Sequence, residues 1–227
     1  MLESGGGFED TRGTLFFEIM RLAKVRKPKY LFLENVKGLL SHDGGQTFGT
    51  ILSTLGECGY DVEWQVLNSK DFGVPQNRER VFIIGHLRGR SRPKVFPITE
   101  TSNATLKQLV GGSQGYRVYD TSGVSCTLAS EAGGMGAKTG LYFVNQPRYG
   151  KYQGSKTSQT IRVGGDIPLV LESSFVRRLT PKECFRLQGF SDEYFERAKA
   201  VNSDSQLYKQ AGNSVTVNVI YEIAKRL

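Results

Sequence analysis

The chain has 227 residues, of which 38% are hydrophobic and 23% are charged, a composition typical of a globular protein and not of a disordered or fibrous one. No apolar run approaches the roughly 20 residues that a membrane span needs, and the N-terminus has no signal-peptide pattern, so we expect a cytoplasmic protein without a membrane partner. The three cysteines, Cys58, Cys126 and Cys184, are too few and too widely spaced to predict a disulfide framework or a metal site.

The first third of the chain alternates helix and strand patterns. Residues 14–27 carry apolar side chains at helical spacing, and Pro28 closes that helix. The segment "YLFLENV" (30–36) follows as a strand that is apolar on both faces, as parallel strands under helices are. This order indicates an α/β domain whose sheet is at least partly parallel. The later patterns are a helix and two strands, at 46–59, 60–68 and 80–86.

The middle of the chain, residues 87–175, has a different character. Glycine clusters separate short β-like pieces such as "RVYD", "GLYFV" and "IPLVL", which indicates a small β or irregular domain. This block holds eleven Lys or Arg against five Asp or Glu, a net of +6 within the chain's total of +8. Such a charge suits a polyanion, with nucleic acid first, but it also suits a solvated basic surface, and charge alone does not separate the two.

Helical patterns return after the basic block. One covers residues 181–200, with Thr180 and Pro181 as a helix start, and another covers the C-terminal residues, with Asn213 or Ser214 as its N-cap. A scaffold that resumes after an insert is a common way to mount a recognition element.

Five sequence blocks stand out, in order and at domain-like distances. They are "GFEDTRGTLFFEI" (7–19), "LFLENV" (31–36), "GVPQNRERVFIIG" (73–85), "RRLTPKECFRLQGF" (177–190) and "QLYKQAGNSVTVNVI" (206–220). Together these blocks resemble the DNA (cytosine-5) methyltransferases. The resemblance implies an α/β fold, a partial doubly wound methyltransferase (Rossmann-like) sheet with an inserted small β or irregular target-recognition domain. Residues 1–86 and 176–227 would form the catalytic-domain portion and residues 87–175 the recognition domain.

Glu34 is the first candidate catalytic residue. Cytosine C6 is a poor electrophile, and a carboxyl group fixed against N3 of the base helps attack there as a general acid. A strand end at the edge of an α/β sheet is where ligands bind, and the resemblance makes Glu34 the base-contacting glutamate. The alternative is an acid that emerges into solvent where a strand ends.

The segment "QNRER" supplies the next candidates, Gln76, Arg78 and Arg80. Alternate positions leading into a strand share one face, and two guanidinium groups there suit phosphate or base oxygens. The resemblance implies that Arg80 lies near a flipped cytosine, and that Arg78 and Gln76 support the site and the DNA. The alternative is a set of salt bridges with Glu79 or Asp71.

The remaining candidates contact the cofactor and the DNA. By resemblance, Asn213, Ser214 and Val215 contribute to the pocket for S-adenosylmethionine, although an ordinary helix cap explains them equally well. The glycine-rich loops of the basic block would present further side chains to bases or phosphates. The DNA-binding candidates there are Arg117, Arg148 and Lys151.

Two motifs of the family are missing from this chain. It has no glycine-rich "FxGxG" turn for the cofactor, and it has no Pro-Cys-Gln motif, whose thiolate attacks C6. None of the three cysteines has the expected neighbours, so none is assigned as the nucleophile. We therefore expect the C-terminal part of an enzyme, inactive by itself, that associates with a complementary N-terminal subunit or with itself.

Three functions are compatible with these features. The first is part of a DNA (cytosine-5) methyltransferase of restriction-modification type, bacterial or phage-encoded, which methylates cytosine in double-stranded nucleoid DNA. The second is a catalytically inactive DNA-binding remnant of such an enzyme. The third is an α/β interaction protein with an incidental basic patch.

Overall fold

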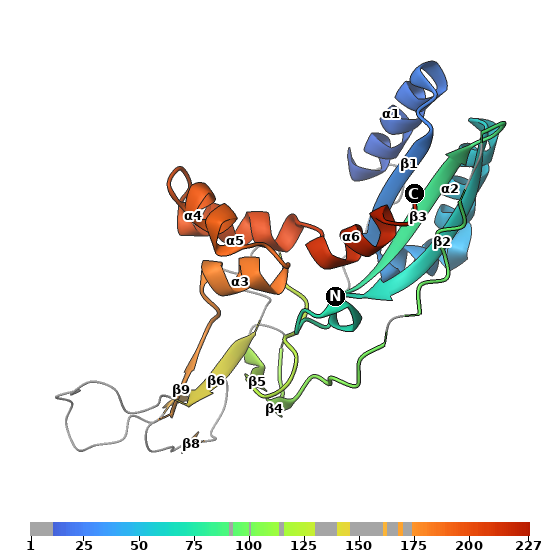
Figure 1. Ribbon diagram of the computed structural model, residues 1–227. Helices are drawn as coiled ribbons and strands as arrows, with labels where there is room; N and C mark the ends of the chain where they lie inside the picture. Colours follow the sequence, from blue (N-terminus) through green and yellow to red (C-terminus); the bar gives the residue numbers. More distant parts are fainter. Residues whose placement is uncertain are drawn as a thin grey trace. The chain divides into compact units, whose positions relative to one another are not determined.

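A computed structural model describes residues 11–90, 93–99, 101–113, 116–129, 140–145, 161–162, 168–169 and 174–227 (Figure 1). Its contacts divide the chain into two compact units. The first unit comprises Met1–Asn68, Glu79–Glu100 and Tyr221–Leu227, and the second comprises Ser69–Arg78 and Thr101–Ile220. The described part of the chain has no helix that is long and apolar enough to cross a membrane.

The first unit is built on a three-stranded sheet. Strands β1 (Tyr30–Val36), β2 (Tyr60–Asn68) and β3 (Glu79–Leu87) lie in the order β1-β3-β2. The three predicted strands are confirmed, but the expected parallel pairing is wrong for this sheet, because β3 pairs antiparallel with both neighbours. The link from β2 to β3 holds only the short 3-10 helix η3 (Ser69–Phe72) and no crossover helix, so the chain returns in the opposite direction.

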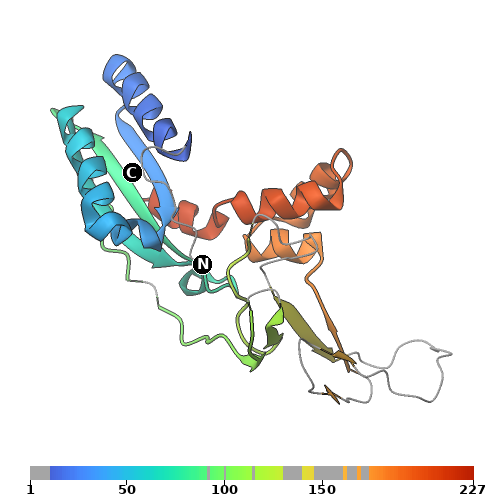
Figure 2. The ribbon, with the colours of Figure 1, turned by 180° about the vertical axis from the view of Figure 1, so that it is seen from behind.

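Two helices cover one face of this sheet. Helix α1 (Thr11–Arg26) stops before Pro28, as predicted, and helix α2 (Gln46–Glu57) runs along the sheet (Figures 1 and 2). Their apolar side chains share one core with alternate residues of the strands. The buried cluster comprises Met20, Ala23, Leu31, Leu39, Phe48, Ile51, Leu55, Cys58, Tyr60, Val81 and Ile83.

The opposite face of the sheet carries the segment that leaves β3. The Glu63 carboxylate accepts the backbone N–H groups of Val95 and Phe96, each at 3.0 Å, and Gln65 bonds both backbone groups of Ile98 at 2.8 Å. Side chains of one strand thus fasten residues 95–98 much as a neighbouring strand would. His86 Nε2 lies 2.7 Å from the same Glu63 carboxylate.

The second unit combines a small sheet with helices. Its four-stranded sheet has the order β4-β5-β6-β9, in which only β5 and β6 are parallel. The predicted β pieces in the middle block are confirmed at β5, β6 and β8. The strands are β4 (Gln108–Val110), β5 (Val118–Asp120), β6 (Leu141–Asn145), β7 (Ile161–Arg162), β8 (Pro168–Leu169) and β9 (Ser174–Arg177).

The helices of the second unit differ from the prediction. The region 181–200 holds two helices, because Gly189 turns with φ +80 between them, and a Cβ there would lie 2.5 Å from Asn218 Oδ1. Asn213 and Ser214 do not cap the last helix; Asn213 ends a helix that the sequence patterns did not reveal, and Ser214 is extended after it. The helices are α3 (Pro181–Leu187), α4 (Asp192–Lys199), α5 (Asp204–Asn213) and α6 (Val217–Ala224), the last of which continues into the first unit.

Packing groups helices α3–α5 with the middle block. They share one buried cluster, to which Leu128 of the middle block belongs together with Cys184, Phe185 and Leu207 of the helices. The expected functional division, with residues 87–175 as the recognition domain, stays a prediction.

Candidate functional site

Glu34 and Arg80 form an ion pair within the first unit. In the antiparallel register Glu34 faces Phe82 and Val36 faces Arg80, so the two charged side chains are diagonal neighbours on one face. Arg80 Nε lies 2.9 Å from Glu34 Oε1, and the side chains are 15% and 25% exposed. Burial lowers the pKa of Arg80, and the neighbouring Glu34 opposes that effect. The pair therefore holds a carboxylate in a fixed orientation while leaving it partly open to a ligand.

Arg78 has a different environment from Arg80. It precedes β3, belongs to the second unit and is 3% exposed. Its guanidinium donates to the backbone carbonyls of Leu128 (3.2 Å), Gly212 (3.1 Å) and Ser214 (2.9 Å). The expected common strand face for Gln76, Arg78 and Arg80 is therefore wrong, and the contacts of Arg78 favour a structural role over direct DNA contact.

Gln76 is fully buried beside Arg78. Its amide nitrogen donates to the carbonyl of Leu187 at 2.8 Å, and its amide oxygen accepts the N–H of Leu128 at 3.2 Å. With both ends of the amide used by backbone groups, Gln76 has no side-chain atom open to DNA in this conformation. Neither Gln76 nor Arg78 bonds Glu79 or Asp71 in the contacts that the structure shows.

The predicted cofactor residues lie on the turn between α5 and α6. Asn213 is exposed, whereas Ala211, Gly212 and Thr216 are buried. Among the described residues, none bonds the side-chain amide of Asn213, so it is available to a ligand. Val215 is half-buried, and the hydroxyl of Ser214 donates to the carbonyl of Ala211 at 2.8 Å.

Two further polar residues fix this turn and were missed by the sequence patterns. Gln188 donates to the carbonyl of Ala211 at 2.8 Å and accepts the Thr216 hydroxyl at 2.9 Å. The Thr216 hydroxyl also lies 2.8 Å from the Ser69 hydroxyl. Gln188 follows α3 in the block "RRLTPKECFRLQGF", and its polar side chain amid packing residues was the available signal.

Of the DNA-binding candidates in the middle block, the structure describes only Arg117. Its Nε donates to the carbonyl of Gly112 at 3.0 Å, and its side chain is half-buried. Arg148 and Lys151 lie outside the described residues, and their roles stay predictions.

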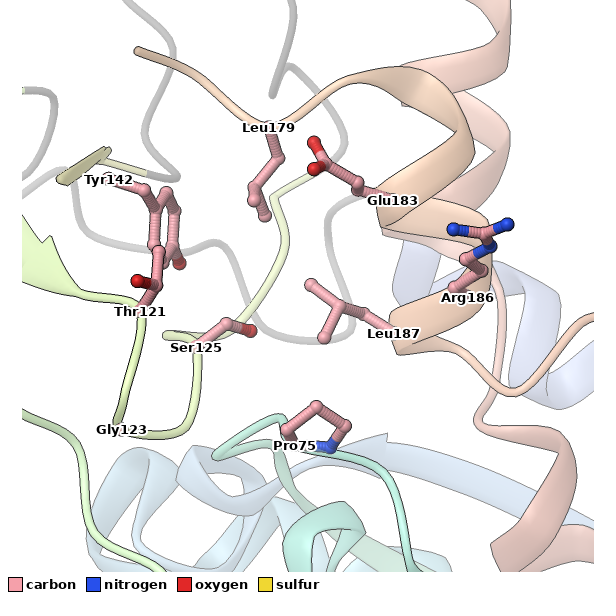
Figure 3. A pocket seen from close by; sticks show the side chains of 9 residues that line it. All are labelled: Pro75, Thr121, Gly123, Ser125, Tyr142, Leu179, Glu183, Arg186 and Leu187. Atoms are coloured by element: carbon pink, nitrogen blue, oxygen red, sulfur yellow. The ribbon is translucent and has the colours of Figure 1, made fainter. Parts of the chain in front are cut away.

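A cavity of about 260 Å³ lies within the second unit (Figure 3). Leu179 and Leu187 line it from the α3 side, opposite Tyr142 and Pro75. Its charged rim is already neutralised, because Glu183 binds Arg177 and Arg186 binds Asp192. The cavity thus offers an apolar surface without an open charge, which suits packing more than chemistry. Its lining residues are Pro75, Thr121, Gly123, Ser125, Tyr142, Leu179, Glu183, Arg186 and Leu187.

The three cysteines are free thiols. Cys58 and Cys184 are buried, and burial raises the pKa of Cys184 to about 12. Burial also raises the pKa of Cys126, whose Sγ lies 3.3 Å from the Tyr142 hydroxyl. A raised pKa keeps a thiol protonated at neutral pH and therefore a poor nucleophile, which supports leaving Cys126 and Cys184 out of the catalytic set.

A family model and three related proteins place this chain among the methyltransferases. The sequence model described as "C-5 cytosine-specific DNA methylase" matches residues 3–227. The Type II methyltransferase M.SsoII of Shigella sonnei is 38% identical, over 97% of this chain and 58% of that protein. M.HhaI of Haemophilus parahaemolyticus is 36% identical, over 96% and 68%, and M.Bsp6I of Bacillus sp. (strain RFL6) is 37% identical, over 97% and 72%. The chain therefore spans only part of the length of each relative.

Two solved structures show a similar fold. The methyltransferase EhMeth of Entamoeba histolytica superposes with a TM-score of 0.65 at 19% identity, over 96% of this chain and 69% of that one. A DNMT2 mutant of Spodoptera frugiperda superposes with a TM-score of 0.62 at 18% identity, over 92% and 70%. These likenesses confirm the predicted α/β methyltransferase fold.

The Glu183 carboxylate gives a prediction for stability against pH. Arg177 donates to it at 2.7 and 2.8 Å, and these bonds, with those from Thr180, lower its pKa to about 2. A lowered folded-state pKa adds stability that is complete above the unfolded pKa near 4.3 and is lost as the pH falls towards 2. The free energy of unfolding, measured in urea, should therefore fall more between pH 7 and pH 3 for the unmodified chain than for Glu183→Gln.

The matched control is Glu193→Gln, at an exposed pair with Arg197. Asp192, whose pKa the bonds from Arg186 also lower, is present in all three proteins and contributes equally. An equal loss in the unmodified chain and in Glu183→Gln would contradict the assignment.

Proposed function

The chain belongs to the C-5 cytosine-specific DNA methylase family, and we propose that it forms the part of a DNA (cytosine-5) methyltransferase that holds the base-contacting carboxylate, the recognition insert and one wall of the cofactor site. The complete enzyme would transfer a methyl group from S-adenosylmethionine to C5 of cytosine in double-stranded DNA. The three relatives named above are Type II methyltransferases, which supports a restriction-modification type.

The observation that carries this proposal is the Glu34–Arg80 pair. Strand β1 is rigid, and it presents the carboxylate with a 2.9 Å contact to Arg80 and with 25% of its side chain still exposed. A flipped cytosine that enters this site would place N3 against Glu34, which holds a proton there while C6 is attacked. Arg80 fixes the orientation of the carboxylate and stabilises charge on the base.

The turn at Asn213 fits one wall of a cofactor site. The exposed amide of Asn213 and the backbone of Ser214 and Val215 can bond the polar groups of S-adenosylmethionine, which supplies the methyl group. The buried side chains behind the turn hold it in place, as a binding site requires. These three residues stay the proposed cofactor contacts.

The nucleophile must come from elsewhere, since this chain has no Pro-Cys-Gln motif. We propose that a complementary polypeptide supplies the cysteine and that this chain alone is inactive. The first unit has a surface suited to such a partner: Leu15, Ile19 and Leu22 lie on one side of α1 and are 40–62% exposed. Strand β1 pairs only with β3 among the described strands, so its other edge is open to a further strand.

A catalytically inactive DNA-binding protein is the second candidate function. The basic middle block and the fold support both candidate functions equally. An inactive protein would give no methyl transfer with any complementary part. A methyl-transfer assay with a polypeptide that carries the Pro-Cys-Gln loop separates the two candidates.

Glu34→Gln tests the catalytic role in the completed enzyme. Loss of a general acid should lower the methyl-transfer rate about 10²–10⁴-fold, while the affinity for duplex DNA changes little. Glu79→Gln is the matched control, because Glu79 is also a glutamate on a strand of the same sheet but pairs with Lys37 at an exposed position. Equal losses of rate and affinity in Glu34→Gln would instead make Glu34 a binding or folding residue.

Duplex binding by the chain alone tests the recognition insert. The affinity should fall steeply with salt, because each phosphate contact that forms releases condensed counterions and adds about −0.9 to the slope of log K against log salt. Arg117→Ala should reduce that slope by about 1, whereas Arg197→Ala, at the exposed Glu193 pair outside the basic block, should leave it unchanged. Absence of duplex binding would leave only the interaction-protein function.

Sedimentation tests the association surface. The chain should show concentration-dependent association or bind the complementary polypeptide, and Leu22→Glu should weaken either event by placing a charge in the apolar contact. Lys24→Glu, on the same helix, is the control for the change of charge. The proposed association surface would be contradicted if the chain stays monomeric at all concentrations and does not bind the complementary polypeptide.

A further inference from the structure

The backbone on both sides of Asn213 is held from its buried side by one residue. Arg78 Nη2 donates to the carbonyl of Gly212 at 3.1 Å and to the carbonyl of Ser214 at 2.9 Å. These carbonyls belong to the two residues on either side of Asn213, whose own side chain is exposed. A planar guanidinium can serve two carbonyls at once, so Arg78 sets the direction in which Asn213 points.

The same guanidinium reaches the middle block. Arg78 Nη1 donates to the carbonyl of Leu128 at 3.2 Å, and Gln76 accepts the N–H of that residue. Leu128 is 2% exposed and packs with Cys184 and Leu207 in the core of the second unit. Arg78 therefore connects a fixed point of the recognition insert to the turn that carries Asn213.

We propose that Arg78 is a positioning residue that shapes the 212–214 turn for S-adenosylmethionine and ties this turn to the recognition insert at Leu128. The identity of the ligand rests on the function proposed above, whereas the placement of the turn does not. A guanidinium that is 3% exposed and directed at three carbonyls acts through the turn and not on the DNA itself.

The rest of the turn has other anchors. Gln188 holds the carbonyl of Ala211 on one side, and the hydroxyls of Thr216 and Ser69 hold the other side. In the contacts of the described residues, only Arg78 reaches the carbonyls of Gly212 and Ser214 with a side chain. Loss of Arg78 should therefore loosen residues 212–214 locally and leave the flanking helices in place.

Hydrogen exchange of the chain alone tests this placement. Arg78→Lys keeps the charge but has one ammonium group, which cannot reproduce the fork that serves the carbonyls. The amides of Ser214 and Val217 should exchange about tenfold faster in Arg78→Lys, while amides in the middle of α3 and α5 exchange at the unmodified rate. If Arg78→Lys does not fold, Arg78→Gln, which keeps an N–H donor without a buried charge, takes its place.

Arg88→Lys is the matched control. Arg88 also donates to backbone carbonyls, those of Gly56 at 3.1 Å and Tyr60 at 3.4 Å, but in the first unit. Its substitution should leave the exchange at Ser214 and Val217 unchanged. Unchanged exchange at these amides in Arg78→Lys, or an equal rise throughout the second unit, would overturn the proposal.

Kinetics of the completed enzyme test the consequence for the cofactor. Arg78→Lys should raise the KM for S-adenosylmethionine about tenfold with a much smaller change in kcat, because the turn is misplaced while Glu34 is not. Equal changes in KM for cofactor and DNA would make Arg78 a stability residue and overturn the positioning role. If the unmodified completed enzyme makes no methylated product, the proposed function fails, and the exchange result alone still decides whether Arg78 holds the turn.

Discussion

The buried guanidinium of Arg78 is the constraint on which the second unit depends. A charge removed from water is tolerated only when hydrogen bonds replace its hydration, and here the replacements are carbonyls of Leu128, Gly212 and Ser214. These carbonyls come from segments that are far apart in sequence. The requirement to satisfy one cation therefore fixes where the middle block meets the end of α5, in a way that apolar packing, which is not directional, does not.

Arg80, two residues later, shows how the same side chain acts in another environment. It lies in β3, reaches Glu34 on the neighbouring strand and keeps some contact with solvent. Replacing Arg78 would leave backbone carbonyls without a donor, whereas replacing Arg80 would free a carboxylate. A motif that looks uniform in the sequence thus divides into one residue for architecture and one for the proposed chemistry.

The sequence predicted the elements well where local periodicity decides them. Strand β2 was expected at 60–68 and lies there, and the start of α3 was visible in the pair Thr180 and Pro181. It failed where distant contacts decide. The antiparallel pairing of β3 depends on the absence of a crossover helix, and the break at Gly189 depends on Asn218, which lies 29 positions along the chain.

The candidate site shows the same limit. Glu34 and Arg80 were both named from the sequence, but their pairing follows from the β1–β3 register, which no local pattern contains. Gln76 and Arg78 were expected to contact DNA because alternate positions leading into a strand share one face and because guanidinium groups suit phosphate. Their burial becomes intelligible only when the carbonyls of the turn and of the middle block are known.

The segment "QNRER" lies where the two compact units meet along the chain, since Arg78 belongs to the second unit and Arg80 to the first. This position explains why a short segment can matter to both halves of the proposed reaction. Under the proposals above, Arg78 would shape the turn for the cofactor, and Arg80 would orient the carboxylate for the base. Because a single residue, Glu79, joins the two arginines, the covalent chain limits the distance between their Cα atoms. If the proposed function holds, the contacts of Arg78 with the turn and of Arg80 with Glu34 are linked by three residues of covalent chain.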